Sequence, residues 1–135
     1  HTASEAGRAR RSQQILVVED NERNMKLFCG VLQASGYRTL EATTGERAVE
    51  LALEHRPDLV LMDIQLPDID GLDALDRLRA DERSTSMPVL ALTAQAMEGD
   101  RERFLAAGFD GYLSKPVDIA EFVTTVKRYC EGAGR

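Results

Sequence analysis

Hydrophobic and polar positions along this chain follow two alternating periods. Short aliphatic runs, which predict buried strands, are separated by longer segments that repeat apolar residues at helical spacing. The strand-like runs cover residues 15–18, 37–41, 59–62, 89–92 and 111–114. The helical segments cover about 22–34, 45–55, 72–80, 97–107 and 119–130. Glycine or proline separates most of these segments, so their number and order are well marked in the sequence.

Five strand signals that alternate with helices predict right-handed βαβ units and a parallel sheet. The first, third and fourth runs are solidly aliphatic, as expected of strands buried on both faces, whereas the second and fifth are more polar and fit the edges. We therefore predict an α/β fold with a doubly wound five-stranded parallel sheet of order 2-1-3-4-5. One domain is expected over residues 14–131, with a disordered or artificial tail over 1–13 and a flexible end over 132–135.

The composition is typical of a folded domain and argues against a nucleic-acid-binding or membrane-spanning protein. The hydrophobic content of 43% supports a real core, and the net charge of −6 argues against binding nucleic acid through its phosphates. The sequence contains no apolar run near the ~20 residues that a membrane helix needs, and no secretory signal pattern. We expect a cytoplasmic protein in which Cys29 and Cys130 are reduced; a disulfide would need the first and last helices to pack side by side.

Polar side chains follow four of the predicted strands. Glu19 and Asp20 come after the first strand, Asp63 after the third, Thr93 after the fourth and Lys115 after the fifth. Any one of these residues is more often a helix cap, a turn former or a surface group. Because the carboxyl ends of parallel strands meet at one edge of the sheet, their combination favours a single site.

The chemistry of these side chains indicates phosphoryl transfer. Carboxylate oxygens without nitrogen or sulfur ligands suit Mg²⁺, which we expect between Asp20 and Asp63, with Glu19 acting through a water or as a partial ligand. The Asp63 carboxylate can attack phosphorus and form an aspartyl phosphate. Lys115 would neutralise charge on the phosphoryl oxygens, and the Thr93 hydroxyl would donate a hydrogen bond to one of them.

Four motifs together resemble the receiver domains of response regulators in two-component signalling. They are Leu-Val-Val-Glu-Asp-Asn at 16–21, Leu-Met-Asp-Ile-Gln-Leu-Pro at 61–67 with Asp-Gly at 70–71, Leu-Thr-Ala at 92–94 and Lys-Pro at 115–116. The similarity covers roughly residues 14–130 and implies a flavodoxin-like fold. The stretch 18–27 resembles single-domain regulators of the DivK type and receivers attached to hybrid histidine kinases.

The resemblance implies roles for individual residues. Asp63 would accept a phosphoryl group from a histidine kinase or a histidine phosphotransfer protein, and Asp20, Asp63 and the main-chain carbonyl of Gln65 would bind Mg²⁺. Thr93 and Tyr112 would form a switch pair that changes a protein-binding surface within 94–129. A cis peptide bond is implied before Pro116. Such a protein would be no enzyme beyond phosphorylating itself and slowly losing the phosphate.

Other interpretations remain open from the sequence. A phosphatase of the haloacid-dehalogenase type needs a second acid two residues after its nucleophile, where Gln65 stands, and a flavin module would lack aromatic residues. A degenerate receiver could serve only as a binding scaffold.

Within the receiver class we favour a stand-alone phosphorelay shuttle over a piece of a larger kinase or regulator. We expect it to be monomeric or to dimerise on phosphorylation through helix 97–107. Gln65 and Gln95 are expected to flank the route of attacking water.

Overall fold

The computed structural model of the chain describes residues 13–94 and 99–132, and its centre is one parallel sheet of five strands. The strands are β1 (Gln14–Val18), β2 (Arg38–Ala42), β3 (Leu59–Asp63), β4 (Val89–Thr93) and β5 (Gly111–Ser114). Their order is β2-β1-β3-β4-β5, which confirms the predicted topology. The more polar strands, β2 and β5, lie at the edges and are the least buried, as expected.

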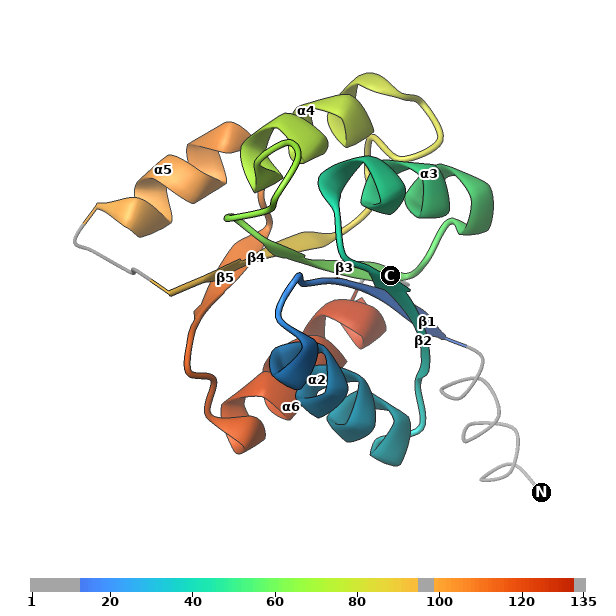
Figure 1. The fold of residues 1–135 in the computed structure, drawn as a ribbon, viewed down its shortest axis with the longest axis vertical. Helices are drawn as coiled ribbons and strands as arrows, with labels where there is room; N and C mark the ends of the chain where they lie inside the picture. Colours follow the sequence, from blue (N-terminus) through green and yellow to red (C-terminus); the bar gives the residue numbers. More distant parts are fainter. Residues whose placement is uncertain (1–12, 95–98, 133–135) are drawn as a thin grey trace.

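Five helices cover both faces of this sheet. They are α2 (Glu22–Ala34), α3 (Gly45–His55), α4 (Gly71–Ala80), α5 (Asp100–Ala107) and α6 (Ile119–Gly132). Helices α3, α4 and α5 lie on one face, and α2 and α6 lie on the other (Figure 1). Of the helix predicted over 97–107, the described part begins at Asp100, and residues 97 and 98 lie outside the described residues. None of the helices in the described ranges has the length and apolar character needed to span a bilayer.

Alternate residues of each central strand point to opposite faces of the sheet and pack in two separate core layers. Val60 and Met62 of β3 pack toward α3 and α4, while Leu59 and Leu61 pack toward α2 and α6. Every residue of β3 and β4 is buried, so these strands form the rigid centre of the domain. In open parallel sheets ligands bind outside the carboxyl ends of the strands, so reactive groups are expected at that end.

Aromatic stacking joins α2 to α6, and each of these helices carries one buried thiol. The rings of Phe28 and Phe122 stack with centroids 5.3 Å apart, a contact worth about 1 kcal/mol beyond simple burial. Cys29 and Cys130 are both buried and free, as predicted. Desolvation raises the pKa of Cys29 to about 11 and that of Cys130 to about 12, so both thiols stay protonated at neutral pH.

Local signals in the sequence determine where the helices begin and end. Four helices begin with a side chain that accepts a hydrogen bond from the N–H three residues later, and these caps are Asn21, Thr44, Asp70 and Asp118. Each is worth about 1 kcal/mol. Gly36 and Gly108 follow α2 and α5 with φ of 97° and 115°, a conformation that favours glycine. Strand β2 begins one residue later than predicted, because the N–H of Tyr37 closes α2 by donating to Leu32 O.

Candidate functional site

The predicted site residues converge at the carboxyl ends of four neighbouring strands. Glu19 directly follows β1, Asp63 and Thr93 are the last residues of β3 and β4, and Lys115 directly follows β5. The parallel register aligns these ends, with Val18 beside Met62 and Thr93 beside Ser114. Three of the side chains, on Glu19, Asp63 and Thr93, are buried, whereas Asp20 is exposed.

Lys115 pairs with two of the acids in the cluster. Its Nζ lies 2.6 Å from Glu19 Oε1 and 2.8 Å from Asp63 Oδ2, and its side chain is only 15% exposed. Burial disfavours the ammonium form, but hydrogen bonds to Asp63 and Glu19 outweigh that cost and raise the pKa of Lys115. The lysine therefore stays positively charged at neutral pH. The Lys115–Pro116 peptide bond is cis, as the sequence resemblance implied.

Main-chain groups hold the other oxygen of each buried carboxylate. The N–H of Asn21 donates to Glu19 Oε2 at 3.1 Å, and the N–H of Gln65 donates to Asp63 Oδ1 at 2.9 Å. Each of these two acids is thus fixed between an ammonium group on one oxygen and a backbone donor on the other. Such fixed orientation prepares a carboxylate for chemistry without a reorganisation cost.

The acids present more negative charge than Lys115 balances. Glu19, Asp20 and Asp63 offer carboxylate oxygens that lie within 4.8 Å of one another. Glu19 Oε1 is buried and, among the described residues, has no hydrogen-bond partner apart from its ion pair with Lys115. Burial also raises the pKa of Glu19, and the nearby Asp63 adds to that effect. A hard divalent cation with oxygen ligands fits this set of donors.

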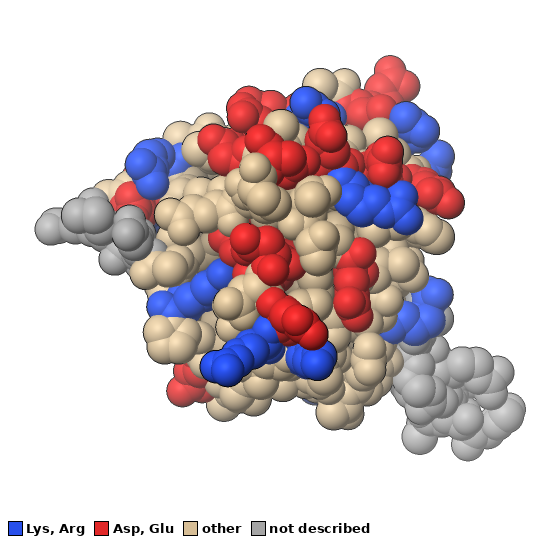
Figure 2. All heavy atoms as spheres, in the orientation of Figure 1, with Lys and Arg blue, Asp and Glu red and all other residues tan. Residues whose placement is uncertain are grey.

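The surface around the cluster is also acidic. Figure 2 shows Asp and Glu side chains gathered at the centre of the drawn face and over α3 and α4. The charge agrees with the net value of −6 for the chain. A face of this kind attracts cations from solution and repels polyanions, and the attraction weakens as salt is added.

Thr93 and Tyr112 lie on the same face of the sheet, toward α5. Tyr112 is the register partner of Ala91, which is two residues before Thr93 and therefore points to the same side. The Tyr112 ring is half-buried and packs against Phe104 of α5, with centroids 5.9 Å apart. The structure thus places both predicted switch residues on the face of the sheet that α5 covers. Gln95, predicted to flank the water route, lies outside the described residues.

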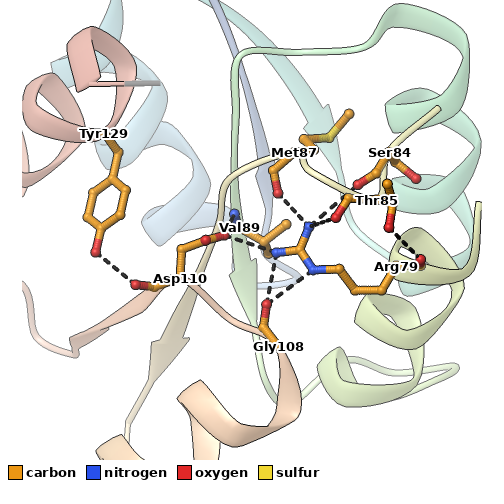
Figure 3. A network of polar contacts seen from close by, with 8 residues as sticks. All are labelled: Arg79, Ser84, Thr85, Met87, Val89, Gly108, Asp110 and Tyr129. Atoms are coloured by element: carbon orange, nitrogen blue, oxygen red, sulfur yellow. Dashed lines mark hydrogen bonds and ion pairs between the residues drawn. The ribbon is translucent and has the colours of Figure 1, made fainter. Parts of the chain in front are cut away.

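Arg79 is the centre of a second polar cluster, at the amino ends of β4 and β5, which the sequence did not reveal (Figure 3). Its guanidinium donates to Asp110 Oδ2 at 2.9 Å and to the main-chain carbonyls of Ser84, Thr85, Met87 and Gly108. Asp110 Oδ2 also accepts from the N–H of Val89, and Asp110 O accepts from the Tyr129 hydroxyl. The acceptors are mostly backbone atoms, which leave no pattern in a sequence.

Comparison with known proteins identifies a family that matches this site. The family model for the response regulator receiver domain matches residues 15–127. The polar-differentiation response regulator DivK of Brucella ovis is 48% identical over 118 residues, which are 87% of this chain and 96% of that protein. DivK of Brucella anthropi is 48% identical over 117 residues, covering 87% and 95% of the two chains.

Solved structures agree with this assignment. The receiver domain of a sensor histidine kinase from Pseudomonas aeruginosa PAO1, which has a magnesium ion coordinated in its active-site cleft, superposes with a TM-score of 0.82 at 41% identity and covers 89% of this chain and 98% of that one. A response regulator structure from Chloroflexus aurantiacus gives a TM-score of 0.83 at 31% identity, covering 88% and 98%. With the acidic cluster, the sheet order and these matches in agreement, the chain belongs to the response regulator receiver domain family of two-component signalling.

Proposed function

We propose that this receiver accepts a phosphoryl group on Asp63 from a histidine kinase or a histidine phosphotransfer protein, in a reaction that requires Mg²⁺. One observation carries the proposal. The Asp63 carboxylate is buried at the end of the central strand, held by Lys115 Nζ on one oxygen and by the Gln65 N–H on the other, beside two further acids. Like charges gathered in this way disfavour one another unless a cation neutralises them, so the arrangement favours a reactive, cation-binding site.

The residues that would hold Mg²⁺ are Asp20, Asp63 and the main-chain carbonyl of Gln65, with Glu19 acting through a water. When bound, the ion supplies positive charge to the phosphoryl oxygens. Support for this set comes from the cluster of carboxylates, from the buried Glu19 Oε1, whose one close partner among the described residues is the Lys115 ammonium, and from the magnesium in the related Pseudomonas receiver.

In the transfer step, an Asp63 carboxylate oxygen forms the new bond to phosphorus as the bond from phosphorus to the donor's histidine nitrogen breaks. The Lys115 ammonium, already 2.8 Å from Asp63, is placed to pair with a phosphoryl oxygen as negative charge builds there. Thr93 would donate a hydrogen bond from its hydroxyl to another of these oxygens. Hydrolysis of the acyl phosphate by water would return the carboxylate, so the protein acts on itself and on no other substrate.

Phosphorylation would change the protein surface formed by β5 and its neighbouring helices. Thr93 is proposed to move toward the phosphoryl group, and Tyr112 to turn inward in response. The support is their common face of the sheet and the packing of Tyr112 on α5. Tyr112 also lines a hollow of about 490 Å³ formed by residues of α5, β5 and α6 and of the segments between them. A protein target docked there would sense the position of the ring.

We further propose that this domain, over residues 14–131, works as a single-domain regulator in the cytoplasm. The support is the match to the DivK relatives over 96% of the Brucella ovis protein. A receiver attached to a sensor kinase is the alternative, because the Pseudomonas relative is such a domain. The two buried free thiols fit a reducing compartment.

Intact-mass analysis after incubation with acetyl phosphate tests the proposal. The wild-type protein is expected to gain one phosphoryl group in the presence of Mg²⁺ and none in the presence of a chelator. Asp63→Asn is expected to gain none under either condition. A folded wild-type protein that stays unmodified with Mg²⁺ present would refute the proposed function and favour a binding scaffold instead.

A further inference from the structure

The loop between β3 and α4, residues 64–70, is tied to a helix that the family motifs do not involve. Its Asp68 side chain accepts a hydrogen bond from the N–H of Gly45 on Oδ1 at 2.7 Å. Its other oxygen, Oδ2, accepts from the N–H of Glu46 at 2.9 Å. Both donors belong to the first turn of α3, so one carboxylate bridges the loop and the helix with two charge-assisted hydrogen bonds.

These bonds satisfy N–H groups at the amino terminus of α3. An α-helix has four N–H groups at its start without partners inside the helix. The Thr44 side chain serves one of them through Oγ1, on Arg47, while its main-chain carbonyl accepts the first bond within the helix, from Ala48. Asp68 serves two more, on Gly45 and Glu46, from a different part of the chain. Its negative charge also matches the positive end of the helix dipole, which favours this partner over a neutral one.

Close packing keeps the loop and the helix in this position. A Cβ atom on Gly45 would lie 2.4 Å from Ile69 Cγ1, so only a residue without a side chain allows this approach. Leu66 and Ile69 pack against the core layer on the α3 and α4 face. Desolvation would raise the pKa of Asp68, but the hydrogen bonds from the Glu46 and Gly45 main chain outweigh it and lower the pKa to about 2. The anchor is therefore ionised throughout the physiological range.

The same loop holds the Asp63 carboxylate. Gln65, three residues before Asp68, donates its N–H to Asp63 Oδ1 at 2.9 Å. At the base of the loop the N–H of Gly71 donates to Ile64 O at 2.8 Å. With the base closed and the tip tied to α3, the main chain at Gln65 has little freedom to move away from Asp63.

We propose that Asp68 is a positioning residue of the phosphoryl site. By anchoring the loop to α3 it holds the Gln65 main chain where the N–H orients Asp63 and the carbonyl can meet the cation. This inference rests on the proposed function, because it assumes that Asp63 and Gln65 bind Mg²⁺. Its effect should appear in the affinity for Mg²⁺ and much less in the chemical step once the metal is bound.

The test compares Asp68→Ala with the wild-type protein in two measurements. Mg²⁺ is titrated while amide resonances are followed by NMR, and the rate of acetyl phosphate labelling is measured at each Mg²⁺ concentration by intact mass. We expect the dissociation constant for Mg²⁺ to rise roughly tenfold in Asp68→Ala, with the labelling rate at saturating Mg²⁺ changed less than about twofold. Asp68→Asn keeps one acceptor oxygen and should fall between the two proteins.

Two matched controls separate positioning from a general loss of stability or charge. Thr44→Ala removes a cap from the same helix without touching the loop, and Asp76→Ala removes an exposed acid from α4. Both should bind Mg²⁺ like the wild-type protein. If Thr44→Ala weakens Mg²⁺ binding as much as Asp68→Ala does, the inference is wrong and α3 stability is the cause.

The outcomes also distinguish this inference from the proposed function. Wild-type protein without saturable Mg²⁺ binding would refute the proposed function itself. Saturable binding in the wild-type protein with an unchanged constant in folded Asp68→Ala would overturn only the role of Asp68. Should Asp68→Ala fail to fold, the Asp68→Asn variant decides the question, because asparagine is also a good capping residue and retains the fold.

Discussion

Two clusters of cations and acids lie at opposite ends of the central strands, and they are built differently. At the amino ends, the Arg79 guanidinium spends its donors on backbone carbonyls and on Asp110. At the carboxyl ends, the Lys115 ammonium stands among three acids, and a buried oxygen of Glu19 has no hydrogen-bond donor apart from that ion pair among the described residues. The first cluster is balanced, whereas the second carries a surplus of negative charge.

The two clusters suit different roles, the Arg79 cluster a role in stability and the Lys115 cluster a role in the proposed reaction. A planar guanidinium with five fixed donors suits a permanent junction between chain segments, and Arg79 joins α4, the 84–87 loop and the end of α5. An ammonium on a flexible stem adapts to a partner that changes, and Lys115 pairs with Glu19 and Asp63 at the proposed phosphoryl site. In the proposed function the receiver would react at the Lys115 end, while the Arg79 cluster stabilises the other end.

The largest effect is expected from removing the balanced junction. Arg79→Ala would leave several carbonyls and the Asp110 carboxylate without their donor, and should lower the free energy of unfolding by about 3 kcal/mol. Urea unfolding measures the change. Arg77→Ala removes a neighbouring exposed arginine and should change the free energy by less than about 0.5 kcal/mol. A loss in Arg79→Ala as small as in this control would mean that the junction is not a source of stability.

At the acidic end, a change of stability is expected from adding Mg²⁺, which should raise the free energy of unfolding. At a Mg²⁺ concentration of 100 times its dissociation constant, the wild-type protein should gain about 2.7 kcal/mol of unfolding free energy. Asp20→Asn removes one ligand and should lose most of this gain, while its metal-free form should be slightly more stable because repulsion among the acids falls. Chemical unfolding with and without Mg²⁺ gives both values. Equal Mg²⁺ stabilisation of the two proteins would show that Asp20 is not a ligand.

A smaller effect should distinguish the parts of the Arg79 junction. Asp110→Asn removes the charge of the ion pair but keeps an oxygen that can accept from the N–H of Val89. Because this ion pair is partly exposed, the cost should be about 1 kcal/mol, below that of Arg79→Ala. Urea unfolding of the two variants measures the difference. If Asp110→Asn cost as much as Arg79→Ala, the carbonyl contacts of Arg79 would contribute nothing to stability.

The smallest effect depends on pH and concerns the turn after α4. Hydrogen bonds from the Arg83 side chain and main chain lower the pKa of Asp81 to about 2 from an ordinary value of 3.8. An acid whose pKa is lowered by folding adds stability above the ordinary value, and that stability is lost as the pH falls toward 2. The difference in Tm between wild-type protein and Asp81→Asn should therefore shrink from pH 5 to pH 2. A difference that stays constant over this range would contradict the role of the charge.

The sequence was a good guide where side chains repeat or follow a strand. Aliphatic runs located the strands, polar edge strands predicted the order, and residues such as Asp63 and Lys115 were placed correctly at the carboxyl ends because a parallel sheet leaves them no other edge. Glycine and proline separated the predicted helices, and α3 begins at Gly45 as expected, directly after its cap Thr44.

The sequence was a poor guide where backbone atoms are the partners. The carbonyls around Arg79 are present at every residue, so their convergence appears only once the chain has folded. Asp68 was missed for a related reason, since α3 already has its own cap in Thr44 and nothing local indicates that a distant loop supplies a second one. Both are tertiary contacts between chain segments, and side-chain periodicity does not record them.

The most direct test of the account is to locate the phosphoryl group. The protein would be labelled with acetyl phosphate and Mg²⁺, reduced with borohydride to convert an aspartyl phosphate into homoserine, and digested for peptide mass spectrometry. We expect a single modified residue at Asp63, with Glu19 and Asp20 unchanged. Homoserine at Asp20, or modification of the Asp63→Asn variant to the wild-type extent, would contradict the assignment of Asp63 as the acceptor.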